Sequence, residues 1–266
     1  MDGLNMKRYS NLYDNITFND FIDVYKEVRK NTKNKIKKFE DFYTVNIVKA
    51  YNIFKNKKYK VGKYNIFLIK EPKYRLIMSS SITDKLINHV ISRKILIPII
   101  EKSLIDENVA TRKGKGTLYG IKLLKKYLNE MNGKIYALKF DISKYFYNID
   151  HNILINLIKK KIKDKDVINI LSEIINSTDD DYINKCIYEV KENEIKKLNK
   201  KNKIIDKVKS IPYYKKGKGL CIGSMSNQIL AIFYLNELDH FIKKKLRVRY
   251  IRYMDDGLLL SNDKII

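Results

Sequence analysis

The chain has 266 residues, enough for one large domain or two smaller subdomains around a hydrophobic core. Its net charge of +25 favours a polyanionic partner, either nucleic acid or, less favourably, an anionic membrane surface, although a general bias towards Lys would give the same excess. Two cysteines without a CxxC spacing exclude a disulfide framework, and no leader pattern or apolar run of membrane-spanning length is found, so we expect a soluble cytoplasmic protein.

Two amphipathic helices are predicted at the start of the chain. Over residues 17–31 the apolar side chains fall on one face, and Thr17 followed by Asp20 is typical of a capping box. A second helix is predicted over residues 39–55.

A β-hairpin is predicted next. Strand-like runs at residues 64–69 and 75–78 lie on either side of a turn that contains Pro72. The hairpin carries two cations, Lys73 and Arg75, in or beside this turn.

Two more helices are predicted after the hairpin. Asp84 is expected to cap a helix that reaches Ile97 and is stopped by Pro98, because proline has no N–H to continue the helical hydrogen bonds. After a flexible glycine-rich stretch, another helix is predicted over residues 117–130.

The second half of the chain combines a strand, several helices and a final hairpin. An apolar strand at residues 135–140 ends at Asp141. Residues 185–216, rich in Lys and Asn, indicate a basic, partly helical insertion, for which a solvated charged surface is favoured over a specific binding arm. This order predicts an α+β fold with a small antiparallel sheet backed by helices. The remaining helices are predicted at residues 151–162, 165–176 and 226–243.

The final hairpin, at residues 251–260, places the pair Asp255-Asp256 between two core strands. Two ionised carboxylates held together beside a core repel each other, and burial adds a desolvation cost. A divalent cation would remove both penalties. The same Asp-Asp-Gly string is equally typical of an ordinary hairpin turn, so the pair alone leaves both interpretations open.

Asp141 supplies a third carboxylate at the mouth of a core strand, where it could ligate a metal ion or cap a turn. Together with Asp255 and Asp256 it would gather three carboxylates at one edge of a sheet. Mg²⁺ prefers such ligands together with substrate phosphates, and two ions about 3.5–4 Å apart clamp the attacking and leaving oxygens of an in-line displacement. With the basic charge, this predicts nucleotidyl transfer.

An ordered set of motifs resembles those of reverse transcriptases. Tyr253-Met254-Asp255-Asp256 looks like their catalytic box, and the string from Phe140 to Phe146 resembles their first carboxylate motif. Residues 219–239 resemble the segment between these two. The hairpin with Lys73 and Arg75 and the stretch 108–117 resemble the fingers motifs. The resemblance covers about residues 50–263 in the right order, which makes it far more specific than one short string.

Within the family, the pattern resembles bacterial enzymes, nearest those of diversity-generating retroelements. Ile222-Gly223-Ser224 and Gln228 fit their Ile-Gly-Asn-x-x-Ser-Gln type of segment. Cys221 departs from this pattern by replacing Pro, and Asn227 departs from it by replacing Ser.

The resemblance implies a right-hand polymerase fold. It predicts N-terminal helices and fingers in residues 1–134, and a palm in residues 135–266 that contains the basic insertion at about 185–216. The reverse transcriptase domain would cover about residues 50–266. Relatives continue into a thumb, so the resemblance also predicts a C-terminally truncated chain without one.

The resemblance assigns metal ligands. Asp141 and Asp255 would be the principal ligands of two Mg²⁺ ions, with Mn²⁺ as a substitute. Asp256 and the backbone carbonyl of Ile142 would assist them.

Phe146 is implied to be an aromatic gate that admits dNTPs and rejects rNTPs, because a flat ring under the sugar leaves no room for a 2′-hydroxyl. Plain core packing of Phe146, or a gate at Tyr145 or Tyr147, stays open.

Five further residues are implied to bind the nucleotide. Lys73 and Arg75 would hold the triphosphate, the lysine less firmly because exposed strand cations are common. Gly223 would let the backbone approach the nucleotide. Ile222 stands where many relatives have Gln, which predicts reduced fidelity. Gln228 would contact the template or nucleotide, or only cap its helix.

The predicted activity is that of an RNA-directed DNA polymerase that extends a DNA or RNA primer on an RNA template with dNTPs. An accessory protein or structured RNA is a further expected partner, and a membrane is not. The alternatives are a truncated remnant that only binds RNA, or the same domain in a group II intron maturase or a phage-defence reverse transcriptase. The three histidines and the acidic run 179–181 are predicted to be structural or solvated.

Overall fold

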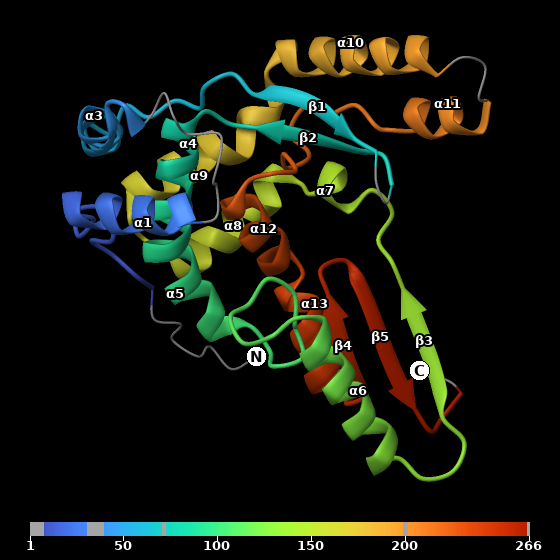
Figure 1. Cartoon of the computed structure of the whole chain (residues 1–266). Helices are drawn as coiled ribbons and strands as arrows, with labels where there is room; N and C mark the ends of the chain where they lie inside the picture. Colours follow the sequence, from blue (N-terminus) through green and yellow to red (C-terminus); the bar gives the residue numbers. More distant parts are fainter. Residues whose placement is uncertain (1–7, 31–39, 71–72, 199–201, 265–266) are drawn as a thin grey trace. The chain divides into compact units, whose positions relative to one another are not determined.

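A computed structural model of the chain describes residues 8–30, 40–70, 73–198 and 202–264 (Figure 1). The chain divides into two compact units, each built from two stretches of sequence. The first unit comprises residues 1–98 and 146–227, and the second comprises residues 99–145 and 228–266. The boundary predicted at residue 134 separates fingers from palm, whereas these two units are separated by their compactness. The boundary between fingers and palm therefore stays a prediction. None of the helices in the described ranges is long and apolar enough to cross a membrane.

The first unit packs helices around a two-stranded antiparallel sheet, as predicted, with β1 (Asn65–Ile69) paired to β2 (Arg75–Ser79). Its helices are α1 (Phe18–Lys30), α3 (Tyr43–Lys55), α4 (Ile82–Ile91), the π-helix η1 (Ser92–Leu96), α8 (His151–Lys161), α9 (Lys165–Asn176), the 3₁₀ turn η3 (Ser177–Asp179), α10 (Asp181–Lys197) and α11 (Asn202–Lys209). The chain passes from one unit to the other within α5 (Ile97–Ile100), at α7 (Tyr145–Asn148) and within α12 (Met225–Tyr234).

The capping box predicted for the first helix is confirmed. The Thr17 N–H donates to the Asp20 carboxylate at 2.8 Å, and the Asp20 N–H donates to the Thr17 hydroxyl at 3.4 Å. These two bonds satisfy N–H groups that the first turn of a helix leaves without partners.

The helix predicted to run from Asp84 to Ile97 differs at both ends. It begins after Ser81, whose hydroxyl accepts from the Asp84 N–H at 3.1 Å. Pro98 does not stop it, because the π-helix η1 precedes the proline and the Ile97 N–H bonds back to the Ser92 carbonyl. A π turn shifts the hydrogen bonds by one residue, and such shifts are one way in which helices accommodate an irregularity.

The predicted basic insertion is largely helical, and one of its faces is buried. Ile183 and Ile187 of α10 pack with Leu76 and Met78 of β2 in one hydrophobic cluster. Figure 1 shows α10 running along the β1–β2 hairpin. The insertion therefore supports the hairpin as well as presenting a charged outer surface.

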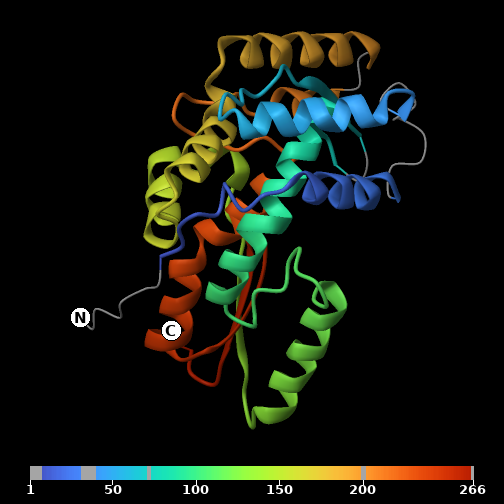
Figure 2. The ribbon, with the colours of Figure 1, turned by 90° about the vertical axis from the view of Figure 1, so that its left-hand side faces the viewer.

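The second unit is a three-stranded antiparallel sheet in the order β3-β5-β4, formed by β3 (Tyr136–Phe140), β4 (Arg249–Tyr253) and β5 (Asp256–Ser261). Helix α6 (Thr117–Glu130), predicted at these bounds, lies beside β4 (Figures 1 and 2). The predicted helix 226–243 is interrupted at Leu235. The remaining helical segments are the 3₁₀ turn η2 (Glu101–Ser103), α13 (Asn236–Phe241) and the π-helix η4 (Ile242–Leu246).

The two faces of this sheet enter different clusters. Tyr250 and Leu259 pack with Ile242 on one face. On the other face Leu260 packs with Tyr127 of α6. This alternation follows the two-residue period of a strand. The predicted α+β fold with a small antiparallel sheet backed by helices is confirmed.

Candidate active site

The register of the sheet brings the three predicted carboxylates to one end of it. Phe140 pairs with Gly257, so Asp141, the next residue, falls in line with Asp256. Tyr253 pairs with Asp256 across the β4–β5 hairpin, which leaves Asp255 in the two-residue loop. The register therefore places the three residues at the same end of the sheet in the second unit, and their joint role as metal ligands stays a prediction.

The turn is made by residues other than those the sequence suggested. Met254 adopts a positive φ of 58°, a conformation that two-residue hairpins usually assign to glycine, asparagine or aspartate. Such a conformation costs of the order of 1–3 kcal/mol in a non-glycine residue. Gly257 lies inside β5 instead, where a Cβ would overlap the ring of Phe140 on the neighbouring strand. Its role is to make room for that ring.

The carboxylates influence one another electrostatically. Partial burial, followed by the charges of Asp141 and Asp256, raises the pKa of Asp255 above its ordinary value. Lys139 offsets part of the negative charge, because its Nζ lies 3.7 Å from an oxygen of Asp256. The hairpin thus carries a local excess of negative charge beside a core.

The donor set fits a hard divalent cation. Carboxylate oxygens are the ligands that Mg²⁺ prefers, and a cation would relieve both the repulsion and the burial cost at Asp255. Over the part of the chain that the structure describes, no group of three or more acidic, His or Cys side chains is gathered closely enough to hold a metal ion. The three carboxylates are therefore suitable donors at one end of the sheet, but they do not form a preformed cluster.

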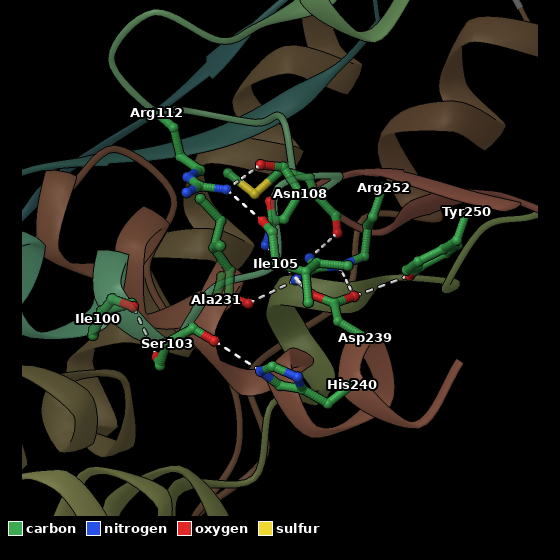
Figure 3. Close-up of polar contacts among 12 residues, drawn as sticks. Ile100, Ser103, Ile105, Asn108, Arg112, Ala231, Asp239, His240, Tyr250 and Arg252 are labelled. Carbon is green, nitrogen blue, oxygen red and sulfur yellow. Dashed lines mark hydrogen bonds and ion pairs between the residues drawn. The ribbon is translucent and has the colours of Figure 1, made fainter. Parts of the chain in front are cut away.

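A buried ion pair lies behind the hairpin (Figure 3). The Arg252 guanidinium donates from Nε to Asp239 Oδ1 at 2.7 Å and from Nη2 to Asp239 Oδ2 at 2.6 Å, and both side chains are fully buried. Nη2 also donates to the Ile232 carbonyl at 2.9 Å, and Nη1 donates to the Met254 carbonyl at 2.5 Å. The Tyr250 hydroxyl donates to Asp239 at 3.0 Å.

The backbone of Arg252 is held from the outer side of β4 as well. Its N–H donates to the Glu107 carbonyl at 3.0 Å, and its carbonyl accepts from the Val109 N–H at 2.9 Å. The Arg112 guanidinium holds this segment through the carbonyls of Ile105, at 2.6 Å, and Asn108, at 2.8 Å (Figure 3). The start of the predicted motif 108–117 thus flanks β4.

The sequence prediction did not identify Arg252 and Asp239 as functional residues. The hairpin predicted at residues 251–260 contains Arg252, and the helix predicted at 226–243 contains Asp239, but no sequence pattern pairs the two. The available signal was the alternation of the strand, which places Arg252 on the same buried face as Tyr250 and Arg249 on the other face. Such a cation requires a buried anion.

The predicted triphosphate ligands lie on the β1–β2 hairpin of the first unit. Lys73 and Arg75 are exposed, and Arg75 alternates with the buried Leu76 of the inner face. Helix α10 anchors this hairpin through Glu194, which is 7% exposed and accepts from Lys70 Nζ at 2.9 Å and from the Tyr74 hydroxyl at 3.4 Å.

The Ile222-Gly223 segment lies along the free edge of β2. The Met78 N–H donates to the Ile222 carbonyl at 2.9 Å. Gly223 has a φ of 131°, and a Cβ there would lie 3.0 Å from the Met78 carbonyl oxygen. Glycine is therefore required on both conformational and steric grounds, and its backbone is exposed.

The two departures from the family pattern contact each other. The Asn227 side-chain amide donates to the Cys221 sulfur at 2.9 Å and to the Cys221 carbonyl at 3.2 Å. Burial raises the pKa of the Cys221 thiol to about 11. Ser226, next to Asn227, donates to Asn88 at 2.6 Å. The segment thus rests on a buried network of neutral polar groups.

The aromatic residues after Asp141 differ in how they are engaged. Tyr145 is buried, and its hydroxyl donates to the Ala231 carbonyl at 2.6 Å. The ring of Tyr147 packs against Tyr214 at 4.8 Å. Phe146 is half-buried. The two other predicted site residues, Ile142 and Gln228, are also half-buried, and Gln228 lies on α12.

The family model for reverse transcriptase (RNA-dependent DNA polymerase) matches residues 56–265. The chain belongs to the reverse transcriptase family. As a reverse transcriptase it is an RNA-directed DNA polymerase, a nucleotidyltransferase whose substrates are nucleotides and a nucleic-acid template and primer. The match covers every predicted site residue. A search of curated proteins finds no match to the chain.

Two of the three histidines of this reverse transcriptase bond to the backbone through their rings, which fits the predicted structural role, whereas the buried Nδ1 of His89 has no hydrogen-bond partner among the described residues. His151 Nε2 lies 2.7 Å from the Gly219 carbonyl, and His240 Nε2 lies 2.8 Å from the Ser103 carbonyl (Figure 3). Within the acidic run 179–181, Asp179 accepts from the Gly217 N–H at 2.8 Å. This carboxylate therefore fixes a loop and is more than a solvated turn residue.

Proposed function

We propose that this reverse transcriptase extends a DNA or RNA primer on an RNA template with dNTPs, using two Mg²⁺ ions for which Mn²⁺ can substitute. Asp141, Asp255 and Asp256, with the backbone carbonyl of Ile142, would hold the ions. The observation that carries this proposal is the sheet register, which aligns Asp141 with the Asp255-Asp256 hairpin. Bound ions would activate the primer 3′-hydroxyl and neutralise the leaving pyrophosphate.

The same proposal makes the β3-β5-β4 sheet the palm and the β1–β2 hairpin part of the fingers. Arg75 would bind the triphosphate by paired hydrogen bonds, and Lys73 would add a point charge. The exposure of both side chains supports this role. Their hairpin is anchored from behind by Glu194, which leaves its outer face available.

Phe146 would act as the gate against ribonucleotides. Phe146 lies five residues after Asp141, the position of the gate in the family, and it is more exposed than the buried Tyr145. The gate would work by steric exclusion of the 2′-hydroxyl.

Ile222 and Gly223 would line the nucleotide, and Gln228 would contact the nucleotide or template. The aliphatic Ile222 supports a polymerase of reduced fidelity, as in diversity-generating retroelements. An accessory protein or structured RNA would then supply the template. Error rates of the wild type and of Ile222→Gln, measured on one template, test this. Equal rates would contradict it.

Primer extension on poly(rA)/oligo(dT) with Mg²⁺ tests the activity. Wild-type protein is expected to incorporate dTTP, and Asp255→Asn is expected to lose at least about a hundredfold, the scale for removal of an electrostatic catalytic group. Asp263→Asn, which removes an exposed carboxylate from the same unit, is the matched control and should retain activity. Binding of the duplex without incorporation would contradict the proposal and favour an RNA-binding remnant.

A further inference from the structure

Arg252 is the largest fully buried side chain among the described residues, and it is charged. We propose that Arg252 is the positioning residue of the carboxylate hairpin: Asp239 fixes its guanidinium, which in turn holds the Met254 carbonyl and so keeps Asp255 in place. This inference rests on the proposed function of Asp255.

The first step is the fixing of the guanidinium. Two of its nitrogens donate to the two oxygens of Asp239, at 2.7 and 2.6 Å, in the planar fork that arginine forms with a carboxylate. Nη2 also donates to the Ile232 carbonyl of α12. With Nε and Nη2 held by α13 and α12, the direction of Nη1 is determined.

The second step is the contact with the turn. Nη1 donates to the Met254 carbonyl at 2.5 Å, and Met254 is the residue that adopts the positive φ. A charged donor on this carbonyl stabilises a backbone conformation that methionine alone disfavours. The Met254 carbonyl belongs to the peptide group that leads into Asp255, so the bond orients the carboxylate-bearing residue directly.

The contacts of Arg252 distinguish a positioning role from simple packing. A desolvated ion pair is often no better for stability than apolar residues of similar volume. Here the pair is reinforced by the Tyr250 hydroxyl, and the Arg252 backbone is bonded to Glu107 and Val109. All these contacts fix Arg252, whereas only the Nη1 bond acts on the turn. We therefore expect its loss to affect metal binding and turnover.

Arg252→Lys tests the proposal, because lysine keeps the charge but cannot form the fork and reach Met254 together. Mn²⁺ titration followed by electron paramagnetic resonance, with no nucleic acid present, measures metal affinity; primer extension measures kcat and KM. We expect at least tenfold weaker Mn²⁺ binding and at least tenfold lower kcat, with KM for dTTP changed less than twofold. Tyr250→Phe removes one bond to Asp239 but leaves the Met254 contact, so the Mn²⁺ affinity and kcat should stay within twofold of wild type.

A rescue variant distinguishes holding the turn from merely filling the core. Glycine adopts a positive φ freely. Met254→Gly in the Arg252→Lys background should therefore recover at least threefold of the lost Mn²⁺ affinity. If Arg252→Lys fails to fold, as circular dichroism would show, the double variant Arg252→Met/Asp239→Leu removes both members of the pair, so that no buried charge is left unpaired, and should give a loss in the same direction.

The outcomes that overturn the positioning role are specific. A folded Arg252→Lys protein with wild-type Mn²⁺ affinity and kcat would do so, and so would a loss that Met254→Gly leaves unchanged. Failure of the underlying function looks different, because the wild type would then bind the duplex without incorporation, or Asp255→Asn would keep the Mn²⁺ affinity and incorporation of the wild type. If Asp255→Asn abolishes Mn²⁺ binding and incorporation while Arg252→Lys changes neither of them, only the role of Arg252 is rejected.

Discussion

The two compact units hold their candidate functional residues in contrasting ways. In the second unit a fully buried ion pair, Arg252–Asp239, contacts the carboxylate hairpin directly. In the first unit the Ile222-Gly223 segment is held by a main-chain bond and rests on neutral side chains. In the same unit Glu194, buried on α10, is paired with the exposed Lys70 of the β1–β2 hairpin. A buried charge therefore contacts the candidate residues directly in the second unit, whereas neutral groups support the Ile222-Gly223 segment in the first.

This difference predicts how each unit responds to substitution. Removing one member of a desolvated pair costs about 3–5 kcal/mol, because the other member stays buried without a partner. A single neutral hydrogen bond contributes about 0.5–1.5 kcal/mol. We therefore expect changes around the carboxylates to abolish turnover, and changes around the nucleotide residues to produce graded effects on nucleotide binding and selection.

Away from the carboxylates and the buried ion pair, the largest effect should come from Gly257→Ala in the second unit. The added methyl overlaps the Phe140 ring, and overpacking of this kind costs about 1–3 kcal/mol. Thermal unfolding should show the destabilisation, and primer extension should fall at least tenfold because the hairpin shifts. Phe140→Leu in the same chain should recover part of both. A Gly257→Ala protein with wild-type melting temperature and activity would show that the carboxylate hairpin is not rigidly held.

Phe146→Val should reduce discrimination against rNTPs in a graded way. Removing part of a ring that excludes one hydroxyl is expected to change the ratio of kcat/KM for dTTP and UTP by about 10–100-fold, the scale of size discrimination in a pocket. Tyr145→Phe, which removes only the hydroxyl bound to Ala231, is the control and should preserve the ratio. If Tyr147→Val changes the ratio and Phe146→Val does not, the gate lies at Tyr147.

Glu194→Gln should have a smaller effect, confined to nucleotide binding. It weakens the bonds to Lys70 and Tyr74 that anchor the hairpin with Lys73 and Arg75. We expect KM for dTTP to rise about two- to fivefold with kcat unchanged, the pattern for lost ground-state binding. Glu189→Gln, at an exposed site on the same helix, should change neither. A fall in kcat alone would contradict the graded behaviour of this unit.

The smallest effect should be a pH-dependent shift in stability at Asp255. Its pKa is raised in the folded chain, so the folded state keeps a proton that the unfolded state releases, and stability falls as pH rises through that window. In metal-free buffer at pH 7, Asp255→Asn should therefore melt at a higher temperature than wild type. The difference should vanish below about pH 4, the ordinary aspartate range.

Added Mg²⁺ should act on the two proteins differently. It should raise the melting temperature of wild type and leave that of Asp255→Asn unchanged, since a ligand stabilises only the state that binds it. A wild type that melts above Asp255→Asn in metal-free buffer at pH 7 would show that repulsion at the hairpin is not the dominant charge effect.

Much of the fold was predictable because its signals are local. The Thr17–Asp20 cap, the bounds of α6 and both hairpins follow from periodicity and turn residues. Alignment of Asp141 with the last hairpin followed from placing both at strand ends. Pro98 was misjudged because the hydrogen-bond shift that accommodates it is set by the preceding π turn.

The anchoring of the carboxylate site was less predictable, because it depends on tertiary contacts. Arg252 and Asp239 are thirteen residues apart (252 − 239) on a strand and a helix, and no local pattern pairs them. Gly257 is required because the Phe140 ring occupies the position of a Cβ, and this contact forms only when β3 pairs with β5. A turn rule applied to Asp-Asp-Gly therefore identified the hairpin and misassigned its glycine.

The burial of Cys221 makes the chain suitable for single-site chemical labelling. Its thiol is almost inaccessible, and its pKa of about 11 keeps it protonated at neutral pH, so it resists maleimides and other thiolate-directed reagents. The other cysteine, Cys186 on α10, is only partly buried. A fluorophore or spin label should therefore attach to α10 alone, next to the β1–β2 hairpin, and would report on the nucleotide binding proposed for that hairpin without engineered cysteines.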